Sequence, residues 1–144
     1  ILKLINKLKI SDSVEIIDNL SDPEPRLVVQ KQMSLCDVFI LPAITTENGH
    51  KQGTPVVLME AQSCSKPCIS TFHAGIPETV IDGQTGILVN ERDTSSIADA
   101  MIKLLDDNAL LKNMANNARK HIEINFNQEI QIEKLVKIYR RLID

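Results

Sequence analysis

The sequence predicts an α/β fold in which a doubly wound parallel sheet lies between flanking helices. Short apolar runs bounded by polar or turn residues are typical of strands that are buried on both faces. These runs alternate with segments of helical periodicity, which is the order that a parallel sheet requires. The expected strands are residues 14–19, 37–42, 66–71 and 87–89.

The first part of the chain predicts two helices around a short strand. Residues 1–10 place apolar side chains at helical spacing with lysines between them. The segment SDPEP at 21–25 holds two prolines, which exclude a continuous helix there. A second helix is expected at 26–35. Its expected inner-face residues are Leu27, Val28 and Leu35.

The middle of the chain predicts a helix between two buried strands. The run at 37–42 leads through a polar loop to Thr54, a good N-cap, and Pro55, a good first helical residue. A helix is therefore expected over 54–65. The next strand, a turn and a short helix are expected at 66–71, 73–77 and 77–82.

The last part predicts a turn, a strand and three helices. The turn DGQTG at 82–86 precedes the strand ILV at 87–89. Asp93 and Asn127 are suitable N-caps for the first and the third of these helices. The helices are expected to end near Leu105, Glu123 and Leu142, and the second to begin near Ala109.

Composition excludes several classes of protein. A chain of 144 residues with 43% hydrophobic and 24% charged residues has the size and balance of one folded domain. Its net charge of −3 argues against a dedicated nucleic-acid binder, which is usually basic. No apolar run approaches the roughly 20 residues of a membrane span. The scattered cysteines and histidines indicate no metal site, and the three cysteines fit core positions in a reducing compartment.

Ligands of doubly wound sheets bind beyond the carboxyl ends of the strands. The loops to consider therefore follow Asn19, Pro42, Thr71 and Val89. The loop after Pro42 leads to Gly53 and a helix start, whose free N–H groups either are simply capped or hold an anion.

Glu60 sharpens this second interpretation. It lies within the apolar segment 56–61, which predicts a helix buried nearly all round. A buried carboxylate needs partners, either a neighbouring loop or the hydroxyl groups of a ligand. Helical rise puts Glu60 about 7 Å along the axis from Pro55. A phosphate at the helix start and a ribose diol on Glu60 are therefore geometrically compatible.

Two further segments have both a structural and a functional interpretation. HAGIPE at 73–78 is either a structural turn or a second ligand-facing junction between a loop and a helix. The last helix carries basic residues that either form a solvated face or contact a lipid headgroup surface. They are Lys134, Lys137, Arg140 and Arg141.

Residues 37–93 resemble the C-terminal donor-binding domain of family 4 (group 1) retaining glycosyltransferases of the GT-B fold. The strings that carry the resemblance are GTPVVLMEA, STFHAGIPE, DGQTGILV and ERD, at these spacings. The similarity continues to FNQEIQIEKLVKIYRRL at 126–142, and this tail and HAGIPE are most similar to bacterial exopolysaccharide enzymes of the colanic acid type. The resemblance implies a Rossmann-like parallel sheet with flanking helices.

The resemblance also assigns site residues. The family motif, two Glu separated by seven residues, ends at Glu60, which would accept hydrogen bonds from the donor's ribose hydroxyls. Backbone amides of Gly53, Thr54, Pro55 and Val56 (for the proline, its flanking peptide groups) would line the diphosphate or the donor sugar. The first catalytic position of the motif falls on Gln52, a departure that keeps an acceptor oxygen and loses the charge.

For the whole protein, the resemblance implies a hexosyl-type glycosyltransferase of polysaccharide biosynthesis. It would transfer a sugar from a nucleoside diphosphate sugar to a saccharide or lipid-linked acceptor with retention, without a metal or other cofactor. We expect it in the cytoplasm, peripheral at the inner membrane, with no nucleic-acid partner. Residues 1–144 would be a partial C-terminal nucleotide-sugar-binding domain, without its first strands and the N-terminal acceptor lobe, and inactive alone.

Two other interpretations stay open. Gln52 motivates a non-catalytic or degenerate nucleotide-sugar-binding domain. A sugar-nucleotide epimerase or a glycan phosphorylase of the same fold is disfavoured by the HAGIPE and GTPVVLME strings.

Overall fold

The computed structural model describes residues 1–18, 23–51 and 53–143. The chain divides into two compact units, one from Ile1 to Gln32 and the other from Met33 onward. The carboxyl ends of the strands, where ligands are expected, belong to the second unit.

The first unit contains α1 (Leu2–Leu8), the short 3₁₀ helix η1 (Ser11–Ser13) and most of α2 (Pro25–Leu35). The prediction of a strand at 14–19 is wrong for residues 14–18. These residues lie in no strand and have no ladder partner among the described residues. Asn19 lies outside the described residues. The predicted helices at 1–10 and 26–35 are confirmed by α1 and α2.

The expected inner face of α2 needs correction. Leu27 and Leu35 are exposed at 56% and 66%, whereas Met33 is 4% exposed and belongs to the core of the second unit. Val28 is half-buried. Met33 is the one buried residue of α2, and Leu27 and Leu35 do not form the predicted inner face.

The second unit is built on three parallel strands in the order β1-β2-β3: β1 (Phe39–Leu41), β2 (Cys68–Thr71) and β3 (Gly86–Val89). Ile69 of β2 pairs with Ile40 on one side and with Ile87 on the other. Three of the four predicted strands are thus confirmed. Because the strands are parallel, their carboxyl ends share one edge of the sheet.

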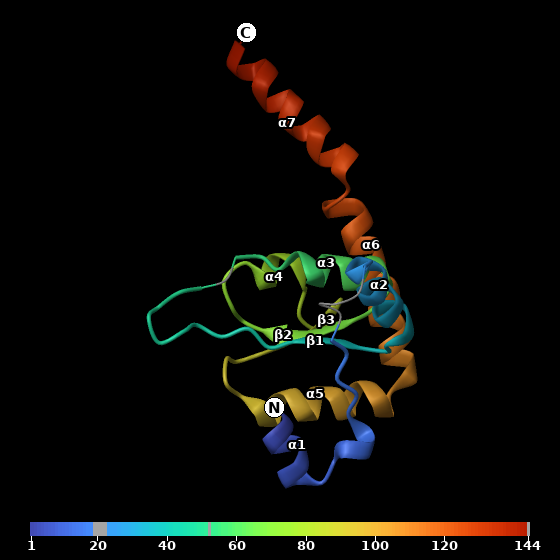
Figure 1. Cartoon of the computed structure of the whole chain (residues 1–144). Coiled ribbons are helices and arrows are strands. Elements are labelled where there is room, and N and C mark those ends of the chain that lie inside the picture. Colours follow the sequence, from blue (N-terminus) through green and yellow to red (C-terminus); the bar gives the residue numbers. More distant parts are fainter. Residues whose placement is uncertain (19–22, 52, 144) are drawn as a thin grey trace. The chain divides into compact units, whose positions relative to one another are not determined.

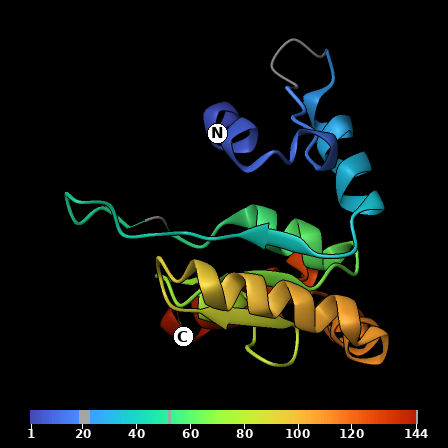
Figure 2. The ribbon, with the colours of Figure 1, turned by 90° about the horizontal axis from the view of Figure 1, so that it is seen from below.

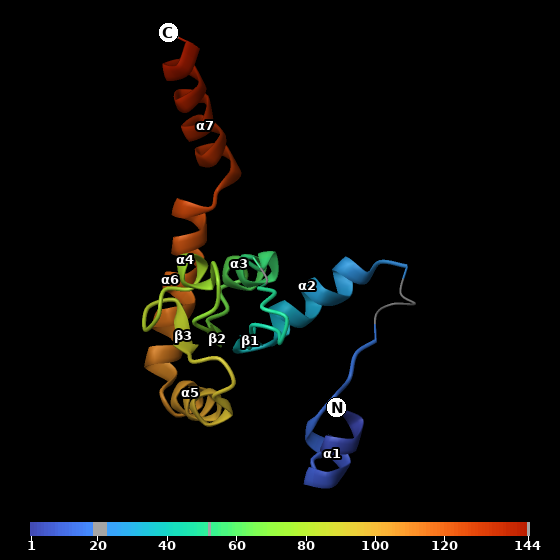
Figure 3. The ribbon, with the colours of Figure 1, turned by 90° about the vertical axis from the view of Figure 1, so that its left-hand side faces the viewer.

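Helices cover both faces of this sheet. α3 (Val56–Ser63) and α4 (Ile76–Thr79) lie on one face, and α5 (Thr94–Asp106) lies on the other (Figures 1 and 3). α6 (Asn108–Asn125) contacts both α3 and α5. α7 (Gln128–Ile143) follows, and its described side chains are all exposed.

The core follows the two-residue period of the strands. Cys68 joins Leu58, Ala61 and Ile76 beneath α3 and α4. Its neighbour Ile69 faces the other way, into a cluster beneath α5. That second cluster is completed by Ala100, Leu104 and Met114. Because both faces of the sheet are covered, none of the three strands carries a charged residue.

Capping confirms two sequence predictions. Asp93 accepts a hydrogen bond from the Ser96 N–H at 3.0 Å and so caps α5. Asn127 Oδ1 accepts from the Glu129 N–H at 2.9 Å before α7. Each side chain satisfies an N–H group that would otherwise have no intrahelical partner.

Candidate functional site

Three loops meet the carboxyl edge of the sheet. Residues 42–55 follow β1, residues 72–75 follow β2, and residues 90–93 follow β3. The first of these reaches well beyond the ends of the strands before it returns to α3 (Figure 2). All three were among the loops that the sequence singled out.

The start of α3 differs from its prediction. The helix begins at Val56 with Pro55 at the N-cap position, and no side chain caps it. Thr54 is therefore not the N-cap. Its side chain instead lies so close to Gly75 that a Cβ added to Gly75 would overlap Thr54 Oγ1. Glycine at position 75 thus lets the HAGIPE turn approach the segment before α3, so the two loop-helix junctions lie together.

The exposure of α3 also corrects a prediction. Val56 is 62% exposed and Glu60 is exposed, whereas Leu58, Ala61 and Gln62 are fully buried. The helix is buried on one face only, since it packs against the sheet on one side and is open on the other. Glu60 therefore needs no protein partner to offset burial, and its carboxylate is accessible to a ligand.

The other predicted donor residues have mixed outcomes. Gly53 and Thr54 are exposed and Pro55 is buried. A Cβ added to Gly53 would meet no atom within 4 Å. Gln52 lies outside the described residues, so its predicted role stays a prediction.

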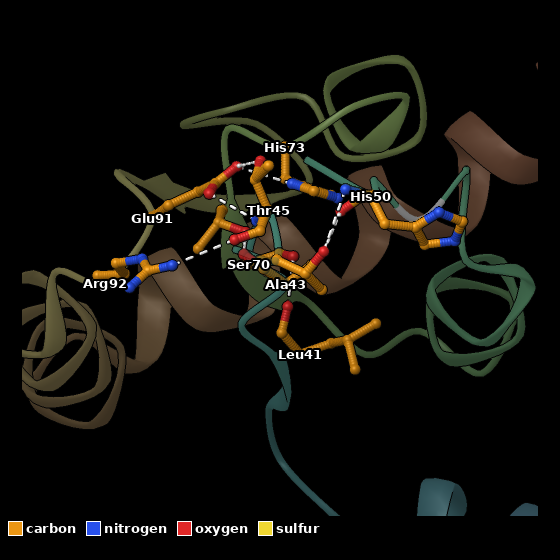
Figure 4. A network of polar contacts seen from close by, with 10 residues as sticks. Leu41, Ala43, Thr45, His50, Ser70, His73, Glu91 and Arg92 are labelled. Atoms are coloured by element: carbon orange, nitrogen blue, oxygen red, sulfur yellow. Dashed lines mark hydrogen bonds and ion pairs between the residues drawn. The ribbon is translucent and has the colours of Figure 1, made fainter. Parts of the chain in front are cut away.

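One carboxylate joins the three loops. Glu91, in the turn after β3, accepts from the Thr45 N–H at 2.7 Å and from Thr45 Oγ1 at 3.0 Å. Its Oε1 also lies 2.7 Å from Nδ1 of His73, in the turn after β2. Figure 4 shows Glu91, His73 and Thr45 converging above the strand ends. We call these three residues with Arg92 the Glu91 network.

The hydrogen bonds determine the charge of this network. The Thr45 N–H bond, followed by the bond to the His73 side chain, lowers the pKa of Glu91 from 4.5 to about 2. The carboxylate is thus ionised at neutral pH and can only accept hydrogen bonds, so His73 Nδ1 carries the donated proton. The His73 side chain is fully buried and that of Glu91 is 24% exposed.

Arg92 completes the attachment of Thr45. Its guanidinium donates to the Thr45 carbonyl oxygen at 3.2 Å. The two neighbouring residues 91 and 92 therefore bind the N–H, the hydroxyl and the carbonyl group of Thr45.

The sequence pattern indicated no site role for Glu91, Thr45 or Arg92. His73 belongs to the HAGIPE segment, which was interpreted either as a structural turn or as a ligand-facing junction. The available signal was their position directly after predicted strands, because parallel strand ends lie side by side. Their pairing depends on side-chain reach across 18 and 46 positions, which local patterns do not encode. In the part of the chain that the structure describes, no three His, Cys, Asp or Glu side chains gather as a metal site.

The fold and this edge place the chain in a known class. The sequence profile described as "Glycosyl transferases group 1" matches residues 1–121. The chain belongs to this family of glycosyltransferases.

Individual relatives agree with the predicted subgroup. WcaL of Escherichia coli strain K12, named for colanic acid biosynthesis, is 34% identical over 141 residues, which are 96% of this chain and 34% of WcaL. The amylovoran biosynthesis glycosyltransferase AmsK of Erwinia amylovora is 33% identical over 119 residues, 83% of this chain and 29% of AmsK. The chain thus spans about a third of the length of these relatives.

Solved structures confirm the fold. Sucrose-phosphate synthase from Thermosynechococcus elongatus superimposes with a TM-score of 0.77 at 25% identity, over 99% of this chain and 33% of that one. HepE from Anabaena, solved in complex with UDP, gives a TM-score of 0.70 at 22% identity, over 94% of this chain and 35% of its own. The three parallel strands and their helices match the C-terminal domains of GT-B glycosyltransferases. Among the described residues, none of the helices combines the length and the hydropathy of a membrane-spanning segment.

Proposed function

We propose that this chain forms part of the nucleotide-sugar-binding lobe of a hexosyl-type glycosyltransferase of polysaccharide biosynthesis. The observation that carries the proposal is the family match over residues 1–121, which includes every loop at the carboxyl edge of the sheet. The relatives named for amylovoran and colanic acid biosynthesis support the polysaccharide setting. HepE, which holds UDP, supports a nucleoside diphosphate sugar as the donor.

In this proposal the start of α3 and Glu60 bind two parts of the donor. The start of α3, where Val56 is exposed and no side chain caps the helix, offers N–H groups and the positive end of the helix dipole to a diphosphate. Glu60 lies one turn further along and is open to solvent. Its carboxylate accepts hydrogen bonds from two ribose hydroxyls, which exchange their water partners for a charged acceptor.

The proposed reaction is transfer of the sugar to a saccharide or lipid-linked acceptor with retention, without a metal ion. Charge that develops on the departing diphosphate is stabilised by donors already aimed at it, which is the electrostatic contribution expected of a helix start. Gln52 occupies the first position of the family motif and positions the donor sugar through its amide oxygen.

The experiment uses the complete gene product. It is titrated calorimetrically with UDP, GDP, UDP-glucose and GDP-mannose, and nucleoside diphosphate release is followed with a bacterial lipid-linked saccharide extract, with and without EDTA. We expect either the uridine or the guanosine compounds to bind. The matching sugar donor should release its nucleoside diphosphate at the same rate with and without EDTA. Absence of binding by all four compounds together with absence of release would overturn the proposal.

A second function, a non-catalytic nucleotide-sugar-binding domain, is favoured by Gln52 alone. This function predicts that the protein binds a nucleotide sugar and releases no nucleoside diphosphate from it. A Gln52→Glu variant that gains release, where the wild type shows none, would establish that this residue is the cause.

A further inference from the structure

The end of β1 and the first residues of the loop after it are held at three successive points. Two buried hydroxyls of β2 begin the series: Ser70 Oγ donates to the Leu41 carbonyl at 2.6 Å, and Thr71 Oγ1 donates to the Ala43 carbonyl at 2.6 Å. The Glu91 network supplies the third point, at Thr45. Each point uses a side chain from a neighbouring strand or turn to hold the loop.

Beyond Thr45, the hydrogen bonds of the described loop residues are internal to the loop. The Thr46 N–H donates to the His50 carbonyl at 3.1 Å, and the His50 N–H donates to Thr46 Oγ1 at 3.0 Å. The Gly49 N–H donates to the Thr46 carbonyl at 2.9 Å. These bonds shape the tip of the loop, and the attachment at Thr45 precedes that tip.

The attachment at Thr45 is stronger than the two before it. It combines two hydrogen bonds from Thr45 to an ionised carboxylate with the bond from buried His73, and hydrogen bonds to a charged group are roughly twice as strong as neutral ones. Arg92 adds a donor to the carbonyl of the same residue. Thr45 is thus fixed through three of its polar groups.

The turns that carry this network have unfavourable backbone conformations. Arg92, directly after Glu91, has φ of 65°, and Ala74, directly after His73, has φ of 44°. Non-glycine residues rarely adopt the left-handed region, and each such residue costs about 1–2 kcal/mol. The backbone is strained next to both Glu91 and His73. Their positions are therefore determined by tertiary contacts and not only by the conformational preference of each turn.

We propose that Glu91 is a positioning residue that fixes the loop after β1 so that its far end presents Gly53 and the start of α3 to the donor. The proposal rests on the proposed function of the edge as a nucleotide-sugar site. Glu91 itself need not touch the donor. Without it, residues 45–51 would move more freely, and ligand binding would have to order them at an entropic cost.

The test measures hydrogen exchange of peptides covering residues 43–51 in the complete gene product, with and without UDP or GDP. Glu91→Gln keeps the size and removes the charge, and Thr45→Val removes only the hydroxyl donor. Thr45→Ser restores that donor, and Glu123→Gln is the matched control, because Glu123 is an exposed residue of α6 paired with Arg119. Melting temperature reports the global fold of each variant.

We expect exchange at 43–51 to be about tenfold faster in Glu91→Gln, and nucleotide Kd to rise about tenfold, as for loss of a charged hydrogen bond. Thr45→Val should show a smaller change in the same direction, whereas Thr45→Ser and Glu123→Gln should behave as the wild type. If Glu91→Gln fails to fold, the difference between Thr45→Val and Thr45→Ser decides.

Two outcomes would overturn the proposal. One is unchanged exchange at 43–51 in Glu91→Gln or, if that variant does not fold, in Thr45→Val. The other is faster exchange with unchanged nucleotide affinity, since the loop would then be held without any effect on the donor. A wild-type protein that binds neither UDP nor GDP contradicts the proposed function instead, while the exchange data still determine whether Glu91 holds the loop.

Discussion

At the scale of single residues, the Glu91 carboxylate links stability to pH. Its pKa is lowered from 4.5 to about 2 in the folded chain, chiefly by the Thr45 N–H and then by His73. A lowered folded pKa means that the ionised group stabilises the fold above pH 4.5, and that this contribution is lost as the pH falls from 4.5 toward 2.

We therefore predict that Glu91→Gln lowers the melting temperature at pH 6, and that the difference from the wild type shrinks as the pH is lowered to 3. The variant cannot ionise at this position, so only the wild type loses the contribution. Melting curves of both proteins at half-unit pH steps measure the effect. A difference that stays constant from pH 6 to pH 3 would contradict the assigned charge state.

Gly53 allows folding and binding to be separated. Its φ is not in the left-handed region and an added Cβ meets nothing within 4 Å, so the fold itself does not require glycine there. We predict that Gly53→Ala changes the unfolding free energy by no more than about 0.5 kcal/mol. Its methyl group would intrude on the donor and raise the nucleotide Kd about tenfold.

Urea denaturation and calorimetric titration of the same Gly53→Ala preparation check both halves of this prediction. Unchanged stability together with unchanged nucleotide affinity would remove Gly53 from the donor site.

Sequence predicted part of the site at this scale. Asp93 and Asn127 were recognised as caps because capping is local. Thr54 was placed wrongly as a cap, because its contact with Gly75 crosses 21 positions and no local pattern reports it. The role of Glu60 was suggested by its position in an apolar helix and then by the family resemblance, that of Gln52 by the resemblance alone, and both stay predictions. Glu91 was missed because its partners lie in two other loops.

At the scale of elements, β3 depends on its first residue. Gly86 pairs with Cys68 in the parallel ladder, and a Cβ on Gly86 would overlap the Cys68 carbonyl oxygen and lie 2.8 Å from Val80 Cγ1. Glycine is required here for close approach of the two backbones, not for an unusual φ.

We predict that Gly86→Ala lowers the unfolding free energy by at least about 2 kcal/mol, because neither the backbone oxygen nor the packed valine can move away freely. Urea denaturation measures it, and Gly53→Ala, where the same methyl group meets open space, is the matched control. Equal stability of the two variants would show that β2 and β3 do not approach as described.

Strands were predicted correctly where a short apolar segment is also buried in the structure. β1, β2 and β3 are buried or half-buried, and each was predicted as a short buried strand. Residues 14–18 also contain three β-branched residues, but two of the five are acidic and none has a ladder partner among the described residues. Ile16 is 57% exposed. Composition reports the tendency to form a strand, whereas pairing depends on what lies beside it.

At the scale of the whole molecule, the loops at the carboxyl edge of the sheet carry Thr45, Gly53, His73 and Glu91. The expectation of ligand loops after the strands came from the parallel topology, and the structure brings three of these loops together through Glu91. The expected burial of α3 was wrong, because the helix covers the sheet with one face and leaves Glu60 accessible. That accessibility is what a donor-binding role requires.

The central claim is that Glu60 and the start of α3 bind the sugar donor. The most direct measurement compares Glu60→Ala with Glu123→Ala, another exposed helical glutamate, in the complete gene product. Since both are exposed, we expect both variants to keep wild-type stability within about 0.5 kcal/mol. Glu60→Ala should lower kcat/KM for the donor at least about tenfold, the loss expected for charged hydrogen bonds. Wild-type kcat/KM in Glu60→Ala would contradict the account.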